Sequence, residues 1–188
     1  MKFKLFYGAR LAVLLLFIIV TPFVNHANAR LTRDHLTQKE ADMVRDTQEL
    51  DKRISIFIKA AERRLQAVAE PNAARSPATD VETWGELKGT RADFLYDLSK
   101  ILDEAITNID DVSARDERNP LVPKAVRKLA DECSRILTQL SPLRDKVEAG
   151  PERHSFEQAL ENAEAILEAA GRLPPPATNT KKKKADKP

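Results

Sequence analysis

The stretch NPLVPKAVRKLADECSRILTQLSPLRDKV, residues 119–147, decides the fold class of this chain. Its apolar residues recur every three or four positions, at Val122, Val126, Leu129, Cys133, Ile136, Leu140, Leu143 and Val147. This spacing places one apolar stripe along one face of a helix. Asn119 and Pro120 have the N-cap and first-position chemistry of a helix start. Pro142 lacks the backbone N–H and should kink the helix near residues 138–141.

A comparable pattern precedes this helix, in residues 37–69. Thr37-Gln38-Lys39-Glu40 is a capping box, in which a hydroxyl and a carboxylate satisfy two backbone N–H groups at a helix start. The stripe that follows recurs at Ile54, Ile58, Ala61, Leu65 and Val68. The pattern fits either one long helix or two helices that break near residues 46–51.

Residues 70–80 predict a loop by composition. A helix is expected to begin at Thr79 or Asp80, with Glu82 completing a capping box. Gly85 and Gly89 weaken its first turns, and Thr90-Arg91-Ala92-Asp93 offers a second capping signal that is compatible with a kink or a restart. The apolar stripe runs through Trp84, Leu87, Leu95, Leu98, Leu102, Ala105 and Ile109, with Phe94, Ile101 and Ile106 beside it.

Gly150-Pro151 predicts the start of a last helix, which should end at Gly171. Its stripe lies at Phe156, Leu160, Ala163, Leu167 and Ala170. Four stripes with a spacing near 3.5, joined by short loops, predict an all-α fold. We expect an antiparallel helix bundle of four main helices, with a short N-terminal helix as an optional fifth element, over residues 30–173. An α-solenoid is the alternative, but we find no repeat of roughly 34 to 45 residues.

Residues 1–29 have the order of a cleavable export signal. Lys2, Lys4 and Arg10 form a basic start, the apolar run 11–20 follows, and Ala27-Asn28-Ala29 supplies small residues for signal peptidase. An uncleaved membrane anchor is the weaker alternative, because a spanning helix needs about 20 apolar residues. We therefore expect cleavage near Ala29 and a mature chain in the periplasm or outside the cell.

Residues 174–188 predict a disordered, basic tail, because three prolines are followed by polar residues and by lysines that repel one another. Clustered lysines attract anionic membrane or wall surfaces, although a purely solubilising tail is the other reading. No aromatic residue lies among them, so specific single-strand stacking is not indicated. The lysines assigned to an anionic-surface contact are Lys181, Lys182, Lys183, Lys184 and Lys187.

Composition argues against a nucleic-acid-binding domain. The chain has 31 Lys and Arg against 29 Asp and Glu. Three of the basic residues lie in the predicted signal and five in the tail, so the body between them is acidic. A nucleic-acid-binding domain would instead carry its basic residues on the folded surface. Cys133 is the one cysteine, so no intrachain disulfide forms, and its place on the stripe predicts a small buried hydrophobe.

The sequence offers no recognisable catalytic, metal or cofactor motif. His35 and His154 belong to no Glu-x-x-His pair, and the chain has no Cys-x-x-Cys-His for haem attachment. Met43 and one of these histidines are the conceivable axial ligands of a non-covalent haem. The carboxylates are predicted to lie on a solvated, salt-bridged face: Asp93, Asp97, Asp103, Glu104, Asp110, Asp111, Glu161, Glu164 and Glu168. We predict no catalytic residue, no metal site and no cofactor.

Trp84, Phe94 and Tyr96 lie close together in the sequence. We expect Trp84 and Phe94 to fill the core and Tyr96 to face outward. If the fold has a groove, the glycine-weakened start of this helix is the first place to look.

Residues 44–49 (VRDTQE), 54–58 (ISIFI) and 61–65 (AERRL) are similar to a stretch of small exported bacterial helical proteins whose function is uncharacterised. The resemblance covers the first mature helices. It implies a bacterial periplasmic setting and implies no functional residue.

These observations favour a non-catalytic exported helix bundle that acts as a binding or scaffolding module of the bacterial cell envelope. The alternative is a periplasmic small-molecule or haem carrier with a site in the bundle core. The expected partners are an unknown protein and an anionic membrane or wall surface reached through the lysines, with no specific nucleic acid. The chain is expected to be a monomer or a homodimer.

Overall fold

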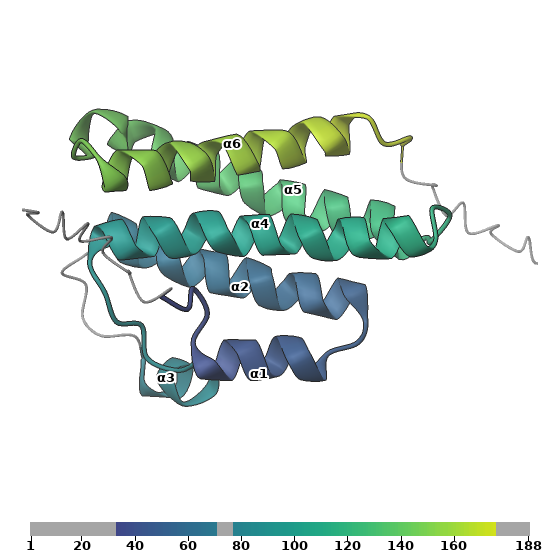
Figure 1. Cartoon of the computed structure of the whole chain (residues 1–188), viewed down its shortest axis with the longest axis horizontal. Coiled ribbons are helices and arrows are strands. Elements are labelled where there is room, and N and C mark those ends of the chain that lie inside the picture. Colours follow the sequence, from purple (N-terminus) through teal and green to yellow (C-terminus); the bar gives the residue numbers. More distant parts are fainter. Residues whose placement is uncertain (1–32, 71–76, 176–188) are drawn as a thin grey trace, which may run out of the picture. The chain divides into compact units, whose positions relative to one another are not determined.

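The computed structural model describes residues 33–70 and 77–175 (Figure 1). The predicted signal, residues 1–29, and the lysines of the predicted tail lie outside the described residues. The helices of the described residues all belong to one compact unit. In the described part of the chain, no helix is both long enough and apolar enough to span a membrane.

The described residues form six α-helices and one 3-10 turn, and they pack as a bundle. Most of the packing joins α2, α4, α5 and α6, with α1 against α2 and α3 against α1. The prediction of an all-α helical bundle is confirmed. The elements are α1 (Gln38–Asp46), α2 (Leu50–Ala69), α3 (Ala78–Trp84), α4 (Arg91–Arg115), α5 (Leu121–Leu140), η1 (Ser141–Lys146) and α6 (Pro151–Gly171).

The directions of the helices follow from contacts between their ends. Arg53, at the start of α2, donates to Asn108 near the end of α4 at 2.9 Å, so these neighbours run in opposite directions. By contrast, Asn162 of α6 donates to the carbonyl of Ser99 at 2.9 Å, and Arg91 and Glu152 pair at the two helix starts. The neighbouring helices α4 and α6 therefore run in the same direction, so the predicted antiparallel arrangement holds for the α2–α4 pair and is wrong for the α4–α6 pair. Helix α5 packs mainly on α6 and α2 (Figure 1).

The capping signals explain where the helices begin. The Thr37–Glu40 box is formed as predicted, and the 37–69 region breaks into two helices at residues 47–49. The Thr90–Asp93 box is also formed, and it starts α4 as a separate helix. The predicted start at Thr79 or Asp80 with a Glu82 box is wrong: α3 begins at Ala78 without a side-chain cap and ends at Gly85. Gly85 has φ +82°, a conformation that a side chain disfavours, so the helix cannot continue easily there.

Helix α5 follows the stripe that defined the fold class. The predicted start, with Asn119 as N-cap and Pro120 as first helical residue, is one residue early: Pro120 is the N-cap and α5 begins at Leu121, whose backbone N–H donates to Asn119 Oδ1 at 3.0 Å. Pro142 ends the α-helix instead of kinking it, because α5 stops at Leu140 and continues as the tighter turn η1. Cys133 is fully buried at the middle of α5, as predicted.

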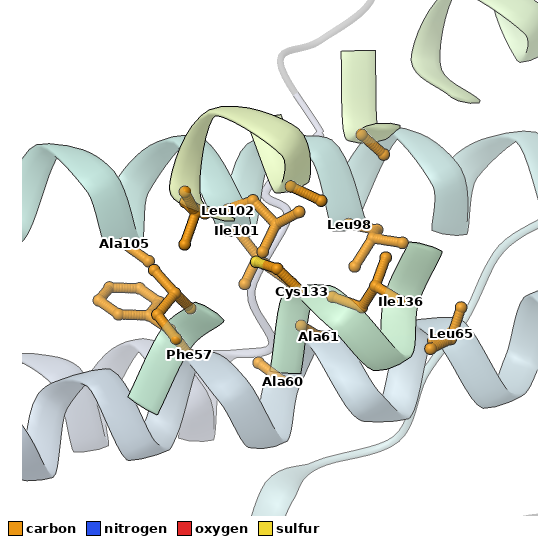
Figure 2. Packing of buried hydrophobic residues seen from close by; sticks show 14 of the residues in the cluster. Phe57, Ala60, Ala61, Leu65, Leu98, Ile101, Leu102, Ala105, Cys133 and Ile136 are labelled. Atoms are coloured by element: carbon orange, nitrogen blue, oxygen red, sulfur yellow. The ribbon is translucent and has the colours of Figure 1, made fainter. Parts of the chain in front are cut away.

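The core runs between the four long helices (Figure 2). It holds aliphatic side chains from α2, α4, α5 and α6, and both phenylalanines in it, Phe57 and Phe156, are fully buried. Figure 2 shows Cys133 between α2 and α4, with Ala60 and Ala61 letting the backbones approach. The central stripe residues are buried, and those near the helix ends, such as Val122, Val126 and Leu143, are partly exposed.

Candidate functional site

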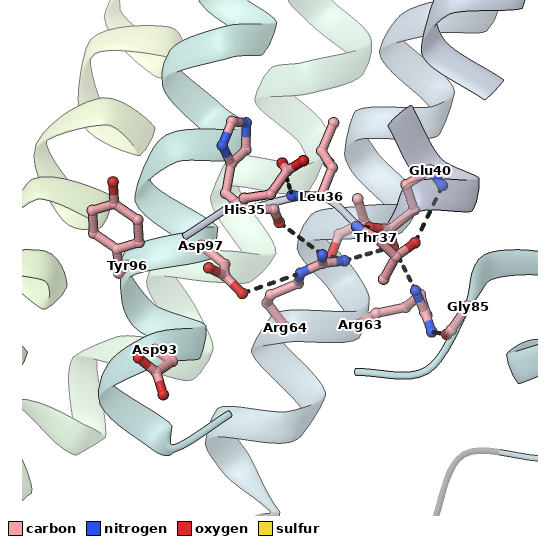
Figure 3. A network of polar contacts seen from close by, with 12 residues as sticks. His35, Leu36, Thr37, Glu40, Arg63, Arg64, Gly85, Asp93, Tyr96 and Asp97 are labelled. Carbon is pink, nitrogen blue, oxygen red and sulfur yellow. Dashed lines mark hydrogen bonds and ion pairs between the residues drawn. The ribbon is translucent and has the colours of Figure 1, made fainter. Parts of the chain in front are cut away.

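Two features outside the apolar core are candidates for function: a buried cluster of charged side chains and an apolar pocket. The cluster lies where α1, α2, α3 and α4 meet (Figure 3). We call it the arginine–carboxylate cluster, and its members are Glu40, Arg63, Arg64, Asp80 and Asp97.

Glu40 is the centre of the cluster. It is fully buried, and its Oε1 accepts from Nη1 of both Arg63 and Arg64 at 2.5 Å. Its Oε2 accepts the backbone N–H of Thr37 at 2.8 Å. One carboxylate therefore caps α1 and holds two guanidinium groups of α2, which compensates the desolvation of its charge.

Arg63 ties α3 to this centre. Its Nε lies 3.1 Å from Asp80 of α3, and its Nη2 donates to the carbonyl of Gly85. Thr37 donates its hydroxyl to the carbonyl of Trp84. A Cβ at Gly85 would lie 3.0 Å from Thr37, so the glycine is needed for this close approach as well as for its positive φ.

Arg64 ties the cluster to α4. Its Nη2 donates to the carbonyl of His35 at 2.7 Å, and its Nε lies 4.0 Å from Asp97. His35 in turn contacts Glu104 of α4, with 2.6 Å between Nε2 and Oε2. The prediction that Asp97 lies on a solvated face is wrong: it is 1% exposed, because it turns toward the guanidinium of Arg64.

The charged groups of the arginine–carboxylate cluster bind one another and backbone carbonyls of the same chain. Both arginine side chains are less than 5% exposed, and their donors are directed at carboxylates and carbonyls of the same chain. A ligand would have to displace these contacts before it could bind. We therefore interpret the cluster as the joint that fastens α1 and α3 to α2 and α4.

A second polar group, at the start of α2, has the residue types of a serine–lysine pair. Lys128 donates to the hydroxyl of Ser55, and that hydroxyl donates to the carbonyl of Asp51 at 2.8 Å. Lys124 also binds Asp51, and this hydrogen bond lowers the pKa of the Asp51 carboxyl. Lys128 also pairs with the Asp51 carboxylate, and the Ser55 hydroxyl donates to a backbone carbonyl. These contacts are typical of a surface ion-pair network, not of an activated nucleophile.

Two neighbouring titratable groups of α5, Glu132 and Cys133, are buried. Burial raises the pKa of Glu132, although the neighbouring Arg135 opposes the shift. Burial also raises the pKa of the Cys133 thiol to about 12, so the group is held as the unreactive thiol.

The apolar pocket opens between α4 and α6, with α5 beneath it. We call it the α4–α6 pocket, and it encloses about 90 Å³. A roughly 150 Å³ apolar cavity accepts benzene, so this pocket suits one aliphatic side chain and is too small for haem. It is lined by Ile106, Ile109, Asp110, Val126, Leu129, Ala165, Ile166 and Ala169.

Other residues named from the sequence are placed as follows. Phe94 packs against the core, and Tyr96 is partly buried. The prediction that Trp84 fills the core is wrong: it is partly buried at the end of α3, outside the core cluster, and its carbonyl accepts from Thr37. The α4–α6 pocket is lined by residues from the second half of α4, whereas the sequence predicted a groove near Gly85 and Gly89. His154 is exposed near the start of α6. Within the described ranges, no group of three or more His, Cys, Asp or Glu could hold a metal ion.

Comparisons with known proteins find no matching family model, no matching curated protein and no matching solved structure. The resemblance to small exported helical proteins therefore stays a prediction from the sequence.

Proposed function

We propose that the chain is a non-catalytic, exported helix bundle that acts as a binding or scaffolding module in the bacterial cell envelope. The observation that carries this proposal is the composition of the α4–α6 pocket. Seven of its lining residues are apolar and the eighth is Asp110. Such a surface can bind an apolar group, but it supplies neither a nucleophile nor a paired acid and base.

The placement of the charged residues supports the same proposal. The buried carboxylates Glu40 and Asp97 pair with Arg64, so these ion pairs hold helices together. Export, near Ala29, and contact of Lys181–Lys184 and Lys187 with an anionic surface are the remaining parts of the proposal, and they rest on the sequence pattern. The four long helices form the body that would carry these contacts.

The carrier alternative requires a ligand in the bundle core. The centre of the core is filled by side chains such as Phe57, Ile101 and Cys133, and the α4–α6 pocket admits a group smaller than benzene. A carrier for a haem-sized ligand would need the helices to separate.

Native mass spectrometry of protein purified from the periplasm tests the proposal. We expect a mature chain that begins at Arg30, with no small molecule bound and with polypeptide partners retained after mild cross-linking. A small ligand that copurifies in fixed ratio would favour the carrier instead. Retention of the protein in the cytoplasm, or turnover of a substrate by the purified chain, would refute the proposal.

A further inference from the structure

The surface around the α4–α6 pocket combines an apolar floor with unpaired negative charge. Ile106 and Asp110 lie one turn apart on α4, and Ala165 and Ala169 lie one turn apart on α6. Both alanines are exposed. Small side chains at this spacing allow another helix to approach closely, and the pocket volume of about 90 Å³ suits one anchoring aliphatic side chain.

Two carboxylates near the pocket are unpaired in the described part of the chain. Asp110 lines the pocket, and Glu161 precedes Ala165 by one helical turn. Neither carboxylate has a hydrogen-bond or ion-pair partner among the described residues. Asp103 and Glu168 lie on the same two helices within one turn of the lining residues, and they are paired with Lys100 and Arg172. Asp110 and Glu161 are therefore available to a basic partner, whereas Arg127, beside Val126, donates to the carbonyls of Pro123 and Pro174.

We propose that the α4–α6 pocket is the docking site for a basic, amphipathic helix of a partner protein, which inserts one aliphatic side chain between Ile106 and Ala165. Lysine or arginine residues one turn before and after this anchor would pair with Asp110 and Glu161. The inference rests on the proposed binding function and adds the chemistry of the partner.

The chemistry of the other occupants fits less well. Residues 176–188 of this chain are basic, but they contain no Leu, Ile, Val, Phe or Met to serve as an anchor. A second copy would offer Leu121, the exposed large hydrophobic residue of the described surface. Leu121 lies on α5, near the lysines that contact α2, whereas the pocket opens between α4 and α6. In a symmetric dimer Leu121 of each copy would have to enter the pocket of the other, and the nearby Lys124 and Lys128 are already paired with Asp51.

A defined peptide tests the proposal directly. The probe is a fluorescein-labelled, alanine-based helix of about 15 residues, close to the minimum length for a helix in water. It carries a central leucine and lysines one turn to either side. One twin peptide has alanine in place of the leucine, and the other has glutamate in place of the lysines. Binding to the full mature chain is followed by fluorescence anisotropy at low and at high salt.

Ala165→Leu fills the pocket from its rim without changing the charge. We expect it to weaken peptide binding about tenfold or more, since an inserted leucine contributes most of its burial energy there. The matched control is Ala149→Leu, the same substitution at an exposed position before α6, which should bind as the native chain does. Asp110→Asn should weaken binding about two- to fivefold at low salt and less at high salt, whereas Glu148→Gln should not.

Several results would overturn the inference. They are absence of binding by the native chain, equal binding of either twin peptide, or no effect of Ala165→Leu in a variant with a native circular dichroism spectrum. Self-association that Ala165→Leu abolishes would assign the pocket to a second copy instead. Each of these results leaves the periplasmic mass measurement unaffected, so failure of the docking site is separable from failure of the proposed function.

Discussion

Replacement of Glu40 by glutamine is the sharpest test of how the N-terminal helix is held. Glu40→Gln preserves the shape of the side chain and keeps an oxygen that can accept the Thr37 N–H. It removes the negative charge that Arg63 and Arg64 share at 2.5 Å. Two guanidinium groups would then remain buried, facing only Asp80 and Asp97.

The expected cost follows from the burial of the partners. Removal of one partner from a buried ion pair typically costs about 3 to 5 kcal/mol, because the other charge is left uncompensated. We expect about 3 kcal/mol, since Asp80 and Asp97 still neutralise part of the charge. For a domain of this size, each kcal/mol lowers Tm by about 2 to 4 °C, so Tm should fall by about 6 to 12 °C.

The loss should be concentrated in α1. This helix is held by the cluster and by a small apolar contact, in which Leu36 is buried and Ala41 and Val44 are partly buried. Burial of one leucine side chain contributes about 1.5 to 3 kcal/mol. The apolar contact therefore cannot hold α1 once the cluster is broken, and α1 should detach before the four long helices unfold.

Urea denaturation gives the total loss, and hydrogen exchange followed by mass spectrometry locates it. Exchange should rise sharply in peptides of α1 and change little in those of α5. Asp42→Asn is the control on the same helix, because Asp42 is 44% exposed and pairs with Arg45 at the surface; it should cost less than about 1 kcal/mol. A loss below 1 kcal/mol for Glu40→Gln, or equal exchange in α1 and α5, would refute the reasoning.

Two further substitutions and one thiol-labelling experiment test the same structure. Gly85→Ala should destabilise the protein by about 1 to 2 kcal/mol in urea denaturation, because φ is +82° and the new Cβ would meet Thr37 at 3.0 Å; a neutral result would contradict this conformation. Cys133, with its pKa raised to about 12, should resist thiol reagents at pH 8 and react once the chain is unfolded; rapid reaction of the native protein would show that α5 is not packed as described. Burial raises the pKa of Glu132 above its usual value of 4.5, so the protonated form favours the folded state below that value and this contribution is lost as pH rises through the folded pKa. Glu132→Gln should therefore increase the free energy of unfolding at pH 7, and the difference should disappear near pH 4; a difference that does not vary with pH would contradict the assignment.

The bundle could be predicted because its information is local and periodic. The stripe from Val122 to Leu140 predicts the buried face of α5, and the capping boxes at Thr37 and Thr90 predict two helix starts. Each of these signals depends on residues within one or two turns of each other. The separation of α3 from α4 was less clear. It depends on Gly85, whose positive φ and contact with Thr37 involve a segment distant in the sequence.

The arginine–carboxylate cluster could not be predicted from the same patterns. Arg63 and Arg64 stand between stripe residues of α2, where a helical pattern expects one of two adjacent charges to face solvent. Both are buried because α1 and α3 cover that side of α2 and supply Glu40 and Asp80. The sequence contains a capping glutamate, Glu40, and an arginine pair about two dozen residues later. Nothing local links them, and only the fold brings them together.

The two sides of helix α4 have different roles: one side forms ion pairs that stabilise the fold, and the other side lines the proposed binding pocket. Its Asp97 and Glu104 face the arginine of α2 and the histidine before α1, so these charges are used in joining helices. On the side of α4 that faces α6, Asp110 stands at an apolar pocket without a partner in the described part of the chain. A charge already neutralised inside the protein adds nothing to the attraction of a partner, whereas an unpaired one at a rim steers and orients it. Glu40→Gln should therefore lower Tm without changing peptide affinity, and Ala165→Leu should lower affinity without changing Tm. If either variant changed both quantities together, the two sides of α4 would be coupled and this separation would be wrong.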